Sequence, residues 1–467
     1  MSLELTCKFL YDVKEVKLAI QVLHVFGQYA CTFEQFDEVS KNFFKIKEYH
    51  EAAVYGEKAY ALATEPQHQY VIRANLINVY NHYNEPEKAL EYIALNEKQL
   101  VHDTDRDFEK AFSLFLMNKK QDAADLLRCK YFDDVTLTEE QRIKVEFNLG
   151  TYDLLDGNLQ QGLRRFLLAG EKLGIHNTFI NQRHDNYNLP RWNGVLKPGL
   201  KLVVIAEAGI GDEIINVRFM KELIEYGIDP IWLTLKNRND LALIYLLNNI
   251  PAYSDINQIP DEFINGCCYI PSMQLPIFLN SAYKDLWKGP YITELDETYQ
   301  KQWKFNLSDN YTEGKPKLKI GLRWQGNPSY DQDLHRSIPL KEIIEAIPIS
   351  HSRLYSIQRD NGLDELFDYI GYVIDLSSRL KTLQDLFSCI NNLDLIITSC
   401  TSIAHIAAAM GKEVCVIVPI SCYYVWCNTS DTTPWYGDNV HIFYQQKPRT
   451  WDEPLNKLNQ YLLSKYN

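Results

Sequence analysis

The spacing of hydrophobic residues changes along the chain and divides it into two kinds of structure. Over residues 1–175, apolar side chains recur three and four positions apart, which is the period of amphipathic helices. Four of these predicted helices carry a small residue at the same point, at intervals of 37, 34 and 39 residues: Ala52, Ala89, Ala123 and Gly162. From residue 200 onward, fully apolar runs alternate with amphipathic stretches. The pattern predicts helical repeats followed by α/β structure.

The small residues have a packing role in this interpretation. They let the two helices of a repeat cross closely, while Tyr, Leu and Phe three and four positions further on fill the space toward the next repeat. The period and arrangement resemble tetratricopeptide repeats, and only the last copy also has the Gly150 and Tyr152 spacing typical of the first helix. An irregular helical bundle is the alternative. Neither structure has chemistry of its own, so we expect this segment to bind a protein partner, an acceptor or another copy of the chain.

The next part of the chain predicts a linker over 176–199 and a first α/β unit over 200–316. The linker has helix breakers and aromatic residues without a period. The unit begins with a strand, a glycine turn and a helix over 201–227, continues with a strand over 229–235 and a helix, and returns to a strand within 267–279. Cys267 and Cys268 belong to the core in this interpretation, and the IPSMQLP sequence that follows them predicts a loop at the cleft.

The glycine turn of this first unit is a candidate site. Gly209 and Gly211 allow close approach of the backbone to a ligand, and Asp212 falls at the predicted helix start. Asp212 can be a general base at the carboxyl end of the strand, where open α/β sheets bind ligands. The alternative, which the local chemistry favours, is a plain N-cap, because Asp is a preferred residue there.

A second α/β unit is predicted over 317–467. It has a strand and turn over 317–328, a helix opening at 335–347, short strands within 353–360 and 372–377, a helix–strand–turn–helix–strand sequence over 380–419, and a final helix over 454–465. A parallel sheet is expected from this alternation.

The turn SCTSIAH in the second unit is the most informative point of the sequence. Cys400, Thr401 and Ser402 lead from a strand into a helix, whose free first-turn amides and positive dipole end attract a phosphate. His405, one turn further on, is within reach of a ribose or phosphate. The alternative is that Thr401 and Ser402 cap the helix while His405 packs against the sheet.

Two arginines favour the phosphate interpretation. Arg323 follows its strand, and Arg336 is expected at a helix start, where a cation is unfavourable unless an anion lies nearby. The acidic residues of 331–333 (DQD) are an alternative site for Mg²⁺ or Mn²⁺, but they lie in a polar loop. No metal is needed if arginines and helix ends hold the phosphates.

Composition excludes several classes of function. The net charge of -13 argues against a large nucleic-acid footprint, which needs clustered Lys and Arg. No stretch of about 18 apolar residues and no leader pattern is present, so we expect a cytoplasmic protein without a membrane span. The ten cysteines are scattered without a CxxC pair, which predicts reduced thiols and no metal site.

Several of these motifs together resemble a known family. Between about 190 and 455 the chain is similar to glycosyltransferases that join tetratricopeptide repeats to a domain related to bacterial heptosyltransferases and, more distantly, to O-linked N-acetylglucosamine transferases. Seven blocks match in order: LPRWNG, AEAGIGDEIINVRF, IPSMQLP with GPY, KIGLRWQGNP with HRSIPL, YSIQ, the stretch from DLSSRL to CVIVP, and TPWYG.

The resemblance implies a GT-B fold of two Rossmann-like domains, with 200–316 on the acceptor side and 317–467 on the nucleotide-sugar side. It implies an inverting transferase that needs no metal and moves a sugar from a nucleotide-diphosphate sugar to a hydroxyl of a protein side chain or a glycan. The alternative is a repeat scaffold with a transferase-like domain that is catalytically inactive.

The resemblance also implies roles for individual residues. Asp212 matches the acidic residue proposed as base in the heptosyltransferases, and Arg336 faces the diphosphate. Thr401 and Ser402 match the pyrophosphate turn, and His405 a place near the ribose. Gln358 borders the nucleotide, and the predicted donor-binding set is completed by Gly209, Gly211, Arg323, Asn327 and Cys400. The chain departs from the family at Cys400, where heptosyltransferase-like members often have an acidic residue.

Overall fold

A computed structural model gives the fold. It describes residues 3–12, 15–98, 104–131, 134–173, 189–235, 238–308, 318–348, 352–359, 361–426 and 430–466. The chain forms two compact units. The N-terminal unit consists of 1–134 with two short segments from far along the chain, 328–335 and 446–450. The C-terminal unit consists of 135–327, 336–445 and 451–467.

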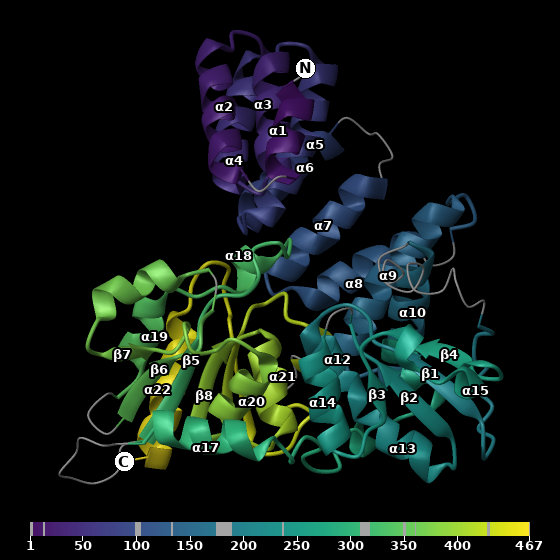
Figure 1. Ribbon diagram of the computed structural model, residues 1–467. Coiled ribbons are helices and arrows are strands. Elements are labelled where there is room, and N and C mark those ends of the chain that lie inside the picture. The colour runs from purple at the N-terminus through teal and green to yellow at the C-terminus, as the bar shows by residue number, and fades with distance from the viewer. Residues whose placement is uncertain are drawn as a thin grey trace. The chain divides into compact units, whose positions relative to one another are not determined.

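The N-terminal unit is built from antiparallel helix pairs (Figure 1). Its helices are α1 (Leu3–Asp12), α2 (Val16–Tyr29), α3 (Phe33–Lys45), α4 (Tyr49–Leu62), α5 (Pro66–His82), α6 (Pro86–Glu97), α7 (Thr104–Leu116) and α8 (Lys120–Tyr131). A continuous apolar core runs through the first six, with Leu23, Phe43 and Leu76 among its fully buried side chains. The helical N-terminal region predicted from the periodicity is confirmed.

One turn geometry recurs in four helix hairpins: the three formed by α3–α8 and a fourth in the C-terminal unit, formed by α9 (Glu139–Leu155) and α10 (Leu159–Lys172). The turns have a left-handed residue at φ between 60° and 90°: Lys47, Asn84, Asn118 and Gly157. The next amide donates to the carbonyl five residues back at 2.8–3.0 Å in every case. The small residue of each predicted repeat follows the left-handed residue by five positions, so the intervals in the sequence are those of the turns.

Close helix crossing explains the glycines of the fourth hairpin. A Cβ at Gly150 would lie 2.4 Å from the backbone nitrogen of Phe166, and one at Gly162 would lie 2.8 Å from that of Leu154. Neither position has room for a side chain, because the obstacle is the backbone of the facing helix.

The two distant segments of the N-terminal unit contact its hairpin turns. Asp331 forms an ion pair with Lys47 at 2.6 Å, and Arg449 forms one with Glu85. Asp331 of the DQD sequence is therefore paired within this unit, while Asp333 is buried. Within the described residues, no group of three or more His, Cys, Asp or Glu side chains is arranged to hold a metal ion.

The C-terminal unit contains two parallel sheets. The first has the order β3-β2-β1-β4 and comprises β1 (Lys201–Ile205), β2 (Asp229–Leu233), β3 (Ala252–Tyr253) and β4 (Cys268–Pro271). Its apolar strands need cover on both faces. One face packs on η1 (Ile256–Gln258) and α15 (Asp261–Ile264), and α12 (Ile210–Val217), α13 (Phe219–Glu225) and α14 (Asn239–Leu247) are the helices that connect its strands.

The second sheet has the order β10-β9-β8-β5-β6-β7. It comprises β5 (Leu318–Arg323), β6 (Ser352–Ser356), β7 (Val373–Asp375), β8 (Leu395–Ser399), β9 (Glu413–Val418) and β10 (Val440–Tyr444). Numbered from β5, this is the doubly wound order 3-2-1-4-5-6, whose switch point lies between β5 and β8. Ligands bind beyond the carboxyl ends of strands at such a point.

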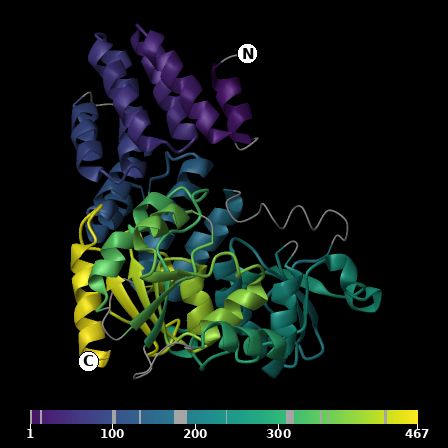
Figure 2. The ribbon, with the colours of Figure 1, turned by 60° about the vertical axis from the view of Figure 1, so that its left-hand side comes forward.

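Helices cover both faces of the second sheet. One face packs on α19 (Leu340–Ala346) and on α22 (Asp452–Tyr466), which appears in yellow along the sheet in Figure 2. The other helices connected to the sheet are α20 (Leu383–Asn391) and α21 (Ser402–Ala409), and α17 (Glu297–Asn306) packs on α20. Parallel α/β structure and the C-terminal helix are thus confirmed, as is the helix–strand–turn–helix–strand sequence of 380–419.

Two local predictions are wrong. Arg336 does not open a helix: it is the last residue of α18 (Asp333–Arg336), and α19 begins only after Pro339. Its position therefore gives no reason of its own to expect an anion. The IPSMQLP sequence is not a loop, because it forms η2 (Ser272–Gln274) and α16 (Leu275–Phe278), with Pro276 in the first turn where its missing N–H is tolerated.

The predicted domain boundaries stay predictions. Most of the linker at 176–199 and the end of the first α/β unit at 309–316 lie outside the described residues. The described part of the chain has no helix long and apolar enough to cross a membrane. Its nine cysteines are free thiols, and Cys267 and Cys268 are buried as expected.

Candidate functional site

The turn after β1 has an unusual backbone. Ala208 is in the left-handed region at φ 59°, a conformation that costs a residue with a Cβ about 1 kcal/mol or more and is concentrated at functional sites. Gly209 follows in extended conformation and is the N-cap of α12. Asp212 is therefore the third residue of the helix and not the N-cap residue itself, but its carboxylate has a capping role in a capping box with Gly209. Its Oδ2 accepts a hydrogen bond from the Gly209 amide at 3.0 Å, which fixes the carboxylate over the helix start.

The other oxygen of Asp212 is also occupied. Tyr423, which follows β9 of the second sheet, donates its hydroxyl to Asp212 Oδ1 at 2.6 Å. Burial raises the pKa of Asp212, although the hydrogen bonds from Tyr423 and Gly209 oppose the rise. A carboxylate with a raised pKa is a better proton acceptor than an exposed one. The sequence did not indicate Tyr423, because 211 positions separate it from Asp212.

A second carboxyl group lies next to Asp212. Glu207 is 1% exposed, and its Oε2 has no hydrogen-bond partner among the described residues. Burial, together with the charge of Asp212, raises the pKa of Glu207 to about 8. Glu207 is therefore largely protonated at neutral pH. A glutamate directly after a fully apolar strand is the signal that sequence reasoning missed.

In the part of the chain that the structure describes, the start of α21 has no side-chain cap, as is also true of several other helices, whereas the start of α20 has one. Thr382, the N-cap of α20, accepts the Asp385 amide in a reciprocal capping box. Thr401 is the N-cap of α21, but its side chain makes no capping bond among the described residues; its hydroxyl contacts that of Thr398 at 3.1 Å. The amides of Ser402 and Ile403 thus have no side-chain cap, and such amides suit an anion.

The two turns lie against each other. A Cβ at Gly211 would be 3.0 Å from His405 Cδ2 and 3.6 Å from Ser402 Cα, so the absence of a side chain permits the approach of α12 and α21. The two helices are neighbours in Figure 1. The carboxyl ends of β1 and β8 consequently bring Asp212 and the open start of α21 to one place.

His405 is buried and neutral. Its Nδ1 lies 3.0 Å from the Tyr436 hydroxyl, and its ring stacks on Trp426 with centroids 4.6 Å apart. Burial, aided by the charge of Arg218, lowers the pKa of His405 to about 3. His405 therefore brings no positive charge to a diphosphate, and any contact with a ribose has to be a hydrogen bond from Nε2, which faces Gly211.

The remaining predicted residues fall into two groups. Arg336 belongs with the α21 turn, since its Nη1 donates to the Cys400 carbonyl at 2.9 Å, and the Cys400 thiol contacts the Trp426 indole nitrogen at 3.1 Å. Arg323, at the end of β5, is paired in register with Thr398 of β8 and so flanks the same switch point.

Gln358 and Asn327 lie in the segments that follow β6 and β5, respectively. Gln358 is fully buried, accepts from the amides of Trp324 and Gln325 at 3.3 Å, and donates to the Asn361 carbonyl at 2.5 Å. These bonds hold the segments after β5 and β6 together. Asn327 is exposed. Gln358 thus has a structural role in the chain as it stands, whatever ligand lies beyond it.

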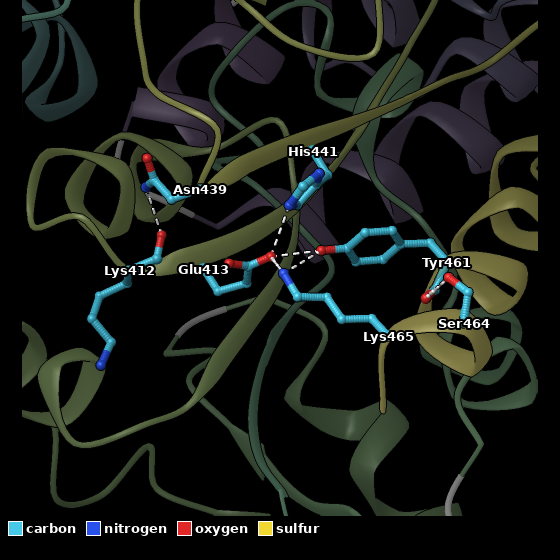
Figure 3. A network of polar contacts seen from close by, with 7 residues as sticks. All are labelled: Lys412, Glu413, Asn439, His441, Tyr461, Ser464 and Lys465. Atoms are coloured by element: carbon cyan, nitrogen blue, oxygen red, sulfur yellow. Dashed lines mark hydrogen bonds and ion pairs between the residues drawn. The ribbon is translucent and has the colours of Figure 1, made fainter. Parts of the chain in front are cut away.

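A second carboxylate, with a lowered and not a raised pKa, lies at the amino ends of the strands of the second sheet (Figure 3). Glu413, the first residue of β9, accepts from His441 Nε2 at 2.7 Å and from the Tyr461 hydroxyl at 2.6 Å, and it pairs with Lys465. Burial alone would raise the pKa of Glu413, but the bonds from Lys465, Tyr461 and His441 hold it below its usual value. This network fastens α22 to β9 and lies at the amino ends of the strands, away from Asp212.

Solved structures of glycosyltransferases are similar to this chain at low sequence identity. No family model and no curated protein matches the chain. A family 9 glycosyl transferase from Veillonella parvula matches with 10% identity and a TM-score of 0.40, over 58% of this chain and 93% of its own. The E. coli ADP-heptose LPS heptosyltransferase II matches with 13% identity and a TM-score of 0.35, over 57% and 100%.

A third solved structure spans most of both chains. The O-GlcNAc transferase of Thermobaculum terrenum matches with 9% identity and a TM-score of 0.30, over 92% of this chain and 90% of its own. These structures are of the kinds that the sequence motifs resemble. With TM-scores below 0.5, they leave the fold and the reaction to be argued from the geometry of this chain.

Proposed function

We propose that the chain is a glycosyltransferase that moves a sugar from a nucleotide-diphosphate sugar to an acceptor hydroxyl. One observation carries the proposal: a partly buried carboxylate, Asp212, lies beside the uncapped start of α21 where the carboxyl ends of two parallel sheets meet. A base and an anion site at one point suit a reaction in which a hydroxyl loses a proton while a diphosphate departs.

The reaction is an in-line displacement at the anomeric carbon. Asp212 takes the proton of the acceptor hydroxyl as its oxygen bonds to the carbon, and the bond from that carbon to the diphosphate oxygen breaks with inversion. The amides of Ser402 and Ile403 hold the charge that develops on the leaving group. Arg336, which contacts the Cys400 carbonyl, and Arg323, at the end of β5, would add to this stabilisation. Fixed donors of this kind supply the charge stabilisation, so the proposal includes no metal.

The proposal extends to the architecture. The two sheets of the C-terminal unit would be the two domains of a GT-B enzyme, and the four hairpins with their repeated turn would be tetratricopeptide repeats. The hairpins would then hold the acceptor or a protein partner, because they bring no candidate catalytic group to the site.

The first test is a thermal-shift screen of the purified protein with UDP, GDP, ADP, CMP and dTDP, with and without Mg²⁺. A ligand that binds only the folded state raises the melting temperature by mass action. We expect one nucleoside diphosphate to raise it without Mg²⁺. No shift with any of the five would contradict the proposed donor site.

The second test separates an enzyme from an inactive scaffold. Asp212→Asn keeps the shape of the side chain and should keep the thermal shift while lowering the rate of sugar transfer roughly 10²- to 10⁴-fold. Asp296→Asn is the matched control, since Asp296 caps α17 through the amides of Thr298 and Tyr299 and lies on another helix. Equal transfer rates in the two variants would contradict the role of Asp212 as base, and no transfer by the parent chain would favour the scaffold.

A further inference from the structure

We infer that Tyr423 occupies the place of the acceptor hydroxyl at Asp212, so that the acceptor enters the site only by displacing it, and water is kept out until then. The inference rests on the proposed function and adds to it a residue that decides between transfer to an acceptor and hydrolysis of the donor. Tyr423 is a positioning residue in this scheme, since it takes no part in the displacement itself.

The two oxygens of Asp212 have different tasks. Oδ2 accepts the Gly209 amide and holds the carboxylate to its own turn. Oδ1 is the oxygen left to take a proton, and the Tyr423 hydroxyl lies on it at 2.6 Å. A general base has to be within hydrogen-bond reach of the proton that it removes. An acceptor hydroxyl therefore competes with Tyr423 for Oδ1.

The surroundings of Tyr423 suit a residue that moves out. Tyr424, Val425 and Trp426 are buried directly after it, and Trp426 stacks on His405. Tyr423 itself is only partly buried. Its ring can turn away from Asp212 while the next three residues keep the segment anchored to the second sheet.

The chemistry of the phenol explains why it waits at the base without reacting. Burial, together with the nearby Asp212 carboxylate, holds the pKa of Tyr423 well above its usual value. The phenol therefore keeps its proton at neutral pH and stays a hydrogen-bond donor to Oδ1. In this position Tyr423 excludes water from Oδ1.

The test compares two tyrosines that each donate to a carboxylate at 2.6 Å. Tyr423→Phe removes the hydroxyl at Asp212. Tyr461→Phe removes the corresponding hydroxyl at Glu413, which lies at the amino end of β9 in the second sheet. Both variants and the parent chain are incubated with UDP-glucose, GDP-mannose and ADP-glucose without an acceptor, and released nucleoside diphosphate is measured across pH. Melting temperatures confirm that each variant folds.

We expect donor hydrolysis to rise roughly tenfold in Tyr423→Phe, the factor that corresponds to losing one hydrogen bond to a charged group, and to stay unchanged in Tyr461→Phe. The acid limb of the pH–rate profile should move to higher pH, because Tyr423 lowers the pKa of Asp212. Hydrolysis and acid limb equal to those of the parent, or slower hydrolysis, would overturn the inference alone. No hydrolysis by any of the three proteins would overturn the inference, and it would overturn the proposed function as well if no nucleotide gives a thermal shift.

Discussion

Glu207 shows how a single residue couples the candidate site to stability. Its pKa is about 8 in the folded chain, against 4.5 for an exposed glutamate. Folding therefore takes up a proton between those two pH values. The contribution of this group to stability is complete below pH 4.5 and is lost as the pH rises toward 8.

Glu207→Gln removes this dependence, because glutamine is neutral at every pH. We expect the variant to match the parent chain near pH 4.5 and to become more stable than it as the pH rises, by roughly 1.4 kcal/mol per pH unit until about pH 8. Urea denaturation from pH 4.5 to 8.5 measures the difference. The exposed Glu262→Gln is the control. A constant difference across that range would mean that Glu207 is ionised in the folded chain.

At the scale of elements, the repeated hairpin turn depends on backbone conformation. Its left-handed position holds asparagine twice and glycine once, the residues that adopt this conformation most easily. A side chain at Gly157 would meet only Tyr283, at 3.9 Å, so space does not restrict it. Substitutions at Gly157 therefore measure the free-energy cost of the left-handed backbone conformation without a steric clash.

We expect Gly157→Asn to cost less than about 1 kcal/mol of unfolding free energy and Gly157→Val to cost about 1–2 kcal/mol more. The asparagine variant is the control for adding a side chain at all, and thermal melts compare the pair. Similar losses in both variants would show that the turn does not hold Gly157 in the left-handed region.

At the scale of the whole molecule, the N-terminal unit is assembled from distant stretches of chain. His335 is 1% exposed, donates from Nε2 to the His82 carbonyl at 3.2 Å, and stacks on Phe112 with centroids 6.3 Å apart. Burial lowers its pKa to about 4, so the ring is neutral at pH 7. The helices α5 and α7 thus depend on a residue more than 200 positions away.

His335→Ala should lower the local stability of the N-terminal unit in α5 and α7 as well as around residue 335. Loss of about 1–2 kcal/mol of local stability corresponds to a roughly 5- to 30-fold rise in amide exchange. We expect the rise in α5 and α7 as well as around residue 335, measured by hydrogen exchange with mass spectrometry at pH 7. The half-exposed Leu334→Ala is the control. A rise confined to the neighbourhood of residue 335 would show that the unit does not fold as one.

The sequence by itself determined the elements and the two turns of the candidate site. Helical periodicity located the hairpins, apolar runs located most strands, and the glycine turn and SCTS turn both stand at helix starts beside the proposed site, because these features depend on neighbouring residues only. The wrong placement of Arg336 also has a local cause: a short helix before Pro339 was read as part of the longer helix after it.

Only the tertiary structure decided what each candidate residue contacts. Gly211 allows α12 to lie close to α21, and His405 is neutral because it is buried. The Gln358 side chain is hydrogen-bonded to the backbone of the chain itself. Tyr423 reaches Asp212 from another sheet, and Glu207 is protonated because burial and the charge of Asp212 disfavour its ionised form. Burial and contacts between residues hundreds of positions apart are set by how the elements pack, and no local pattern in the sequence encodes them.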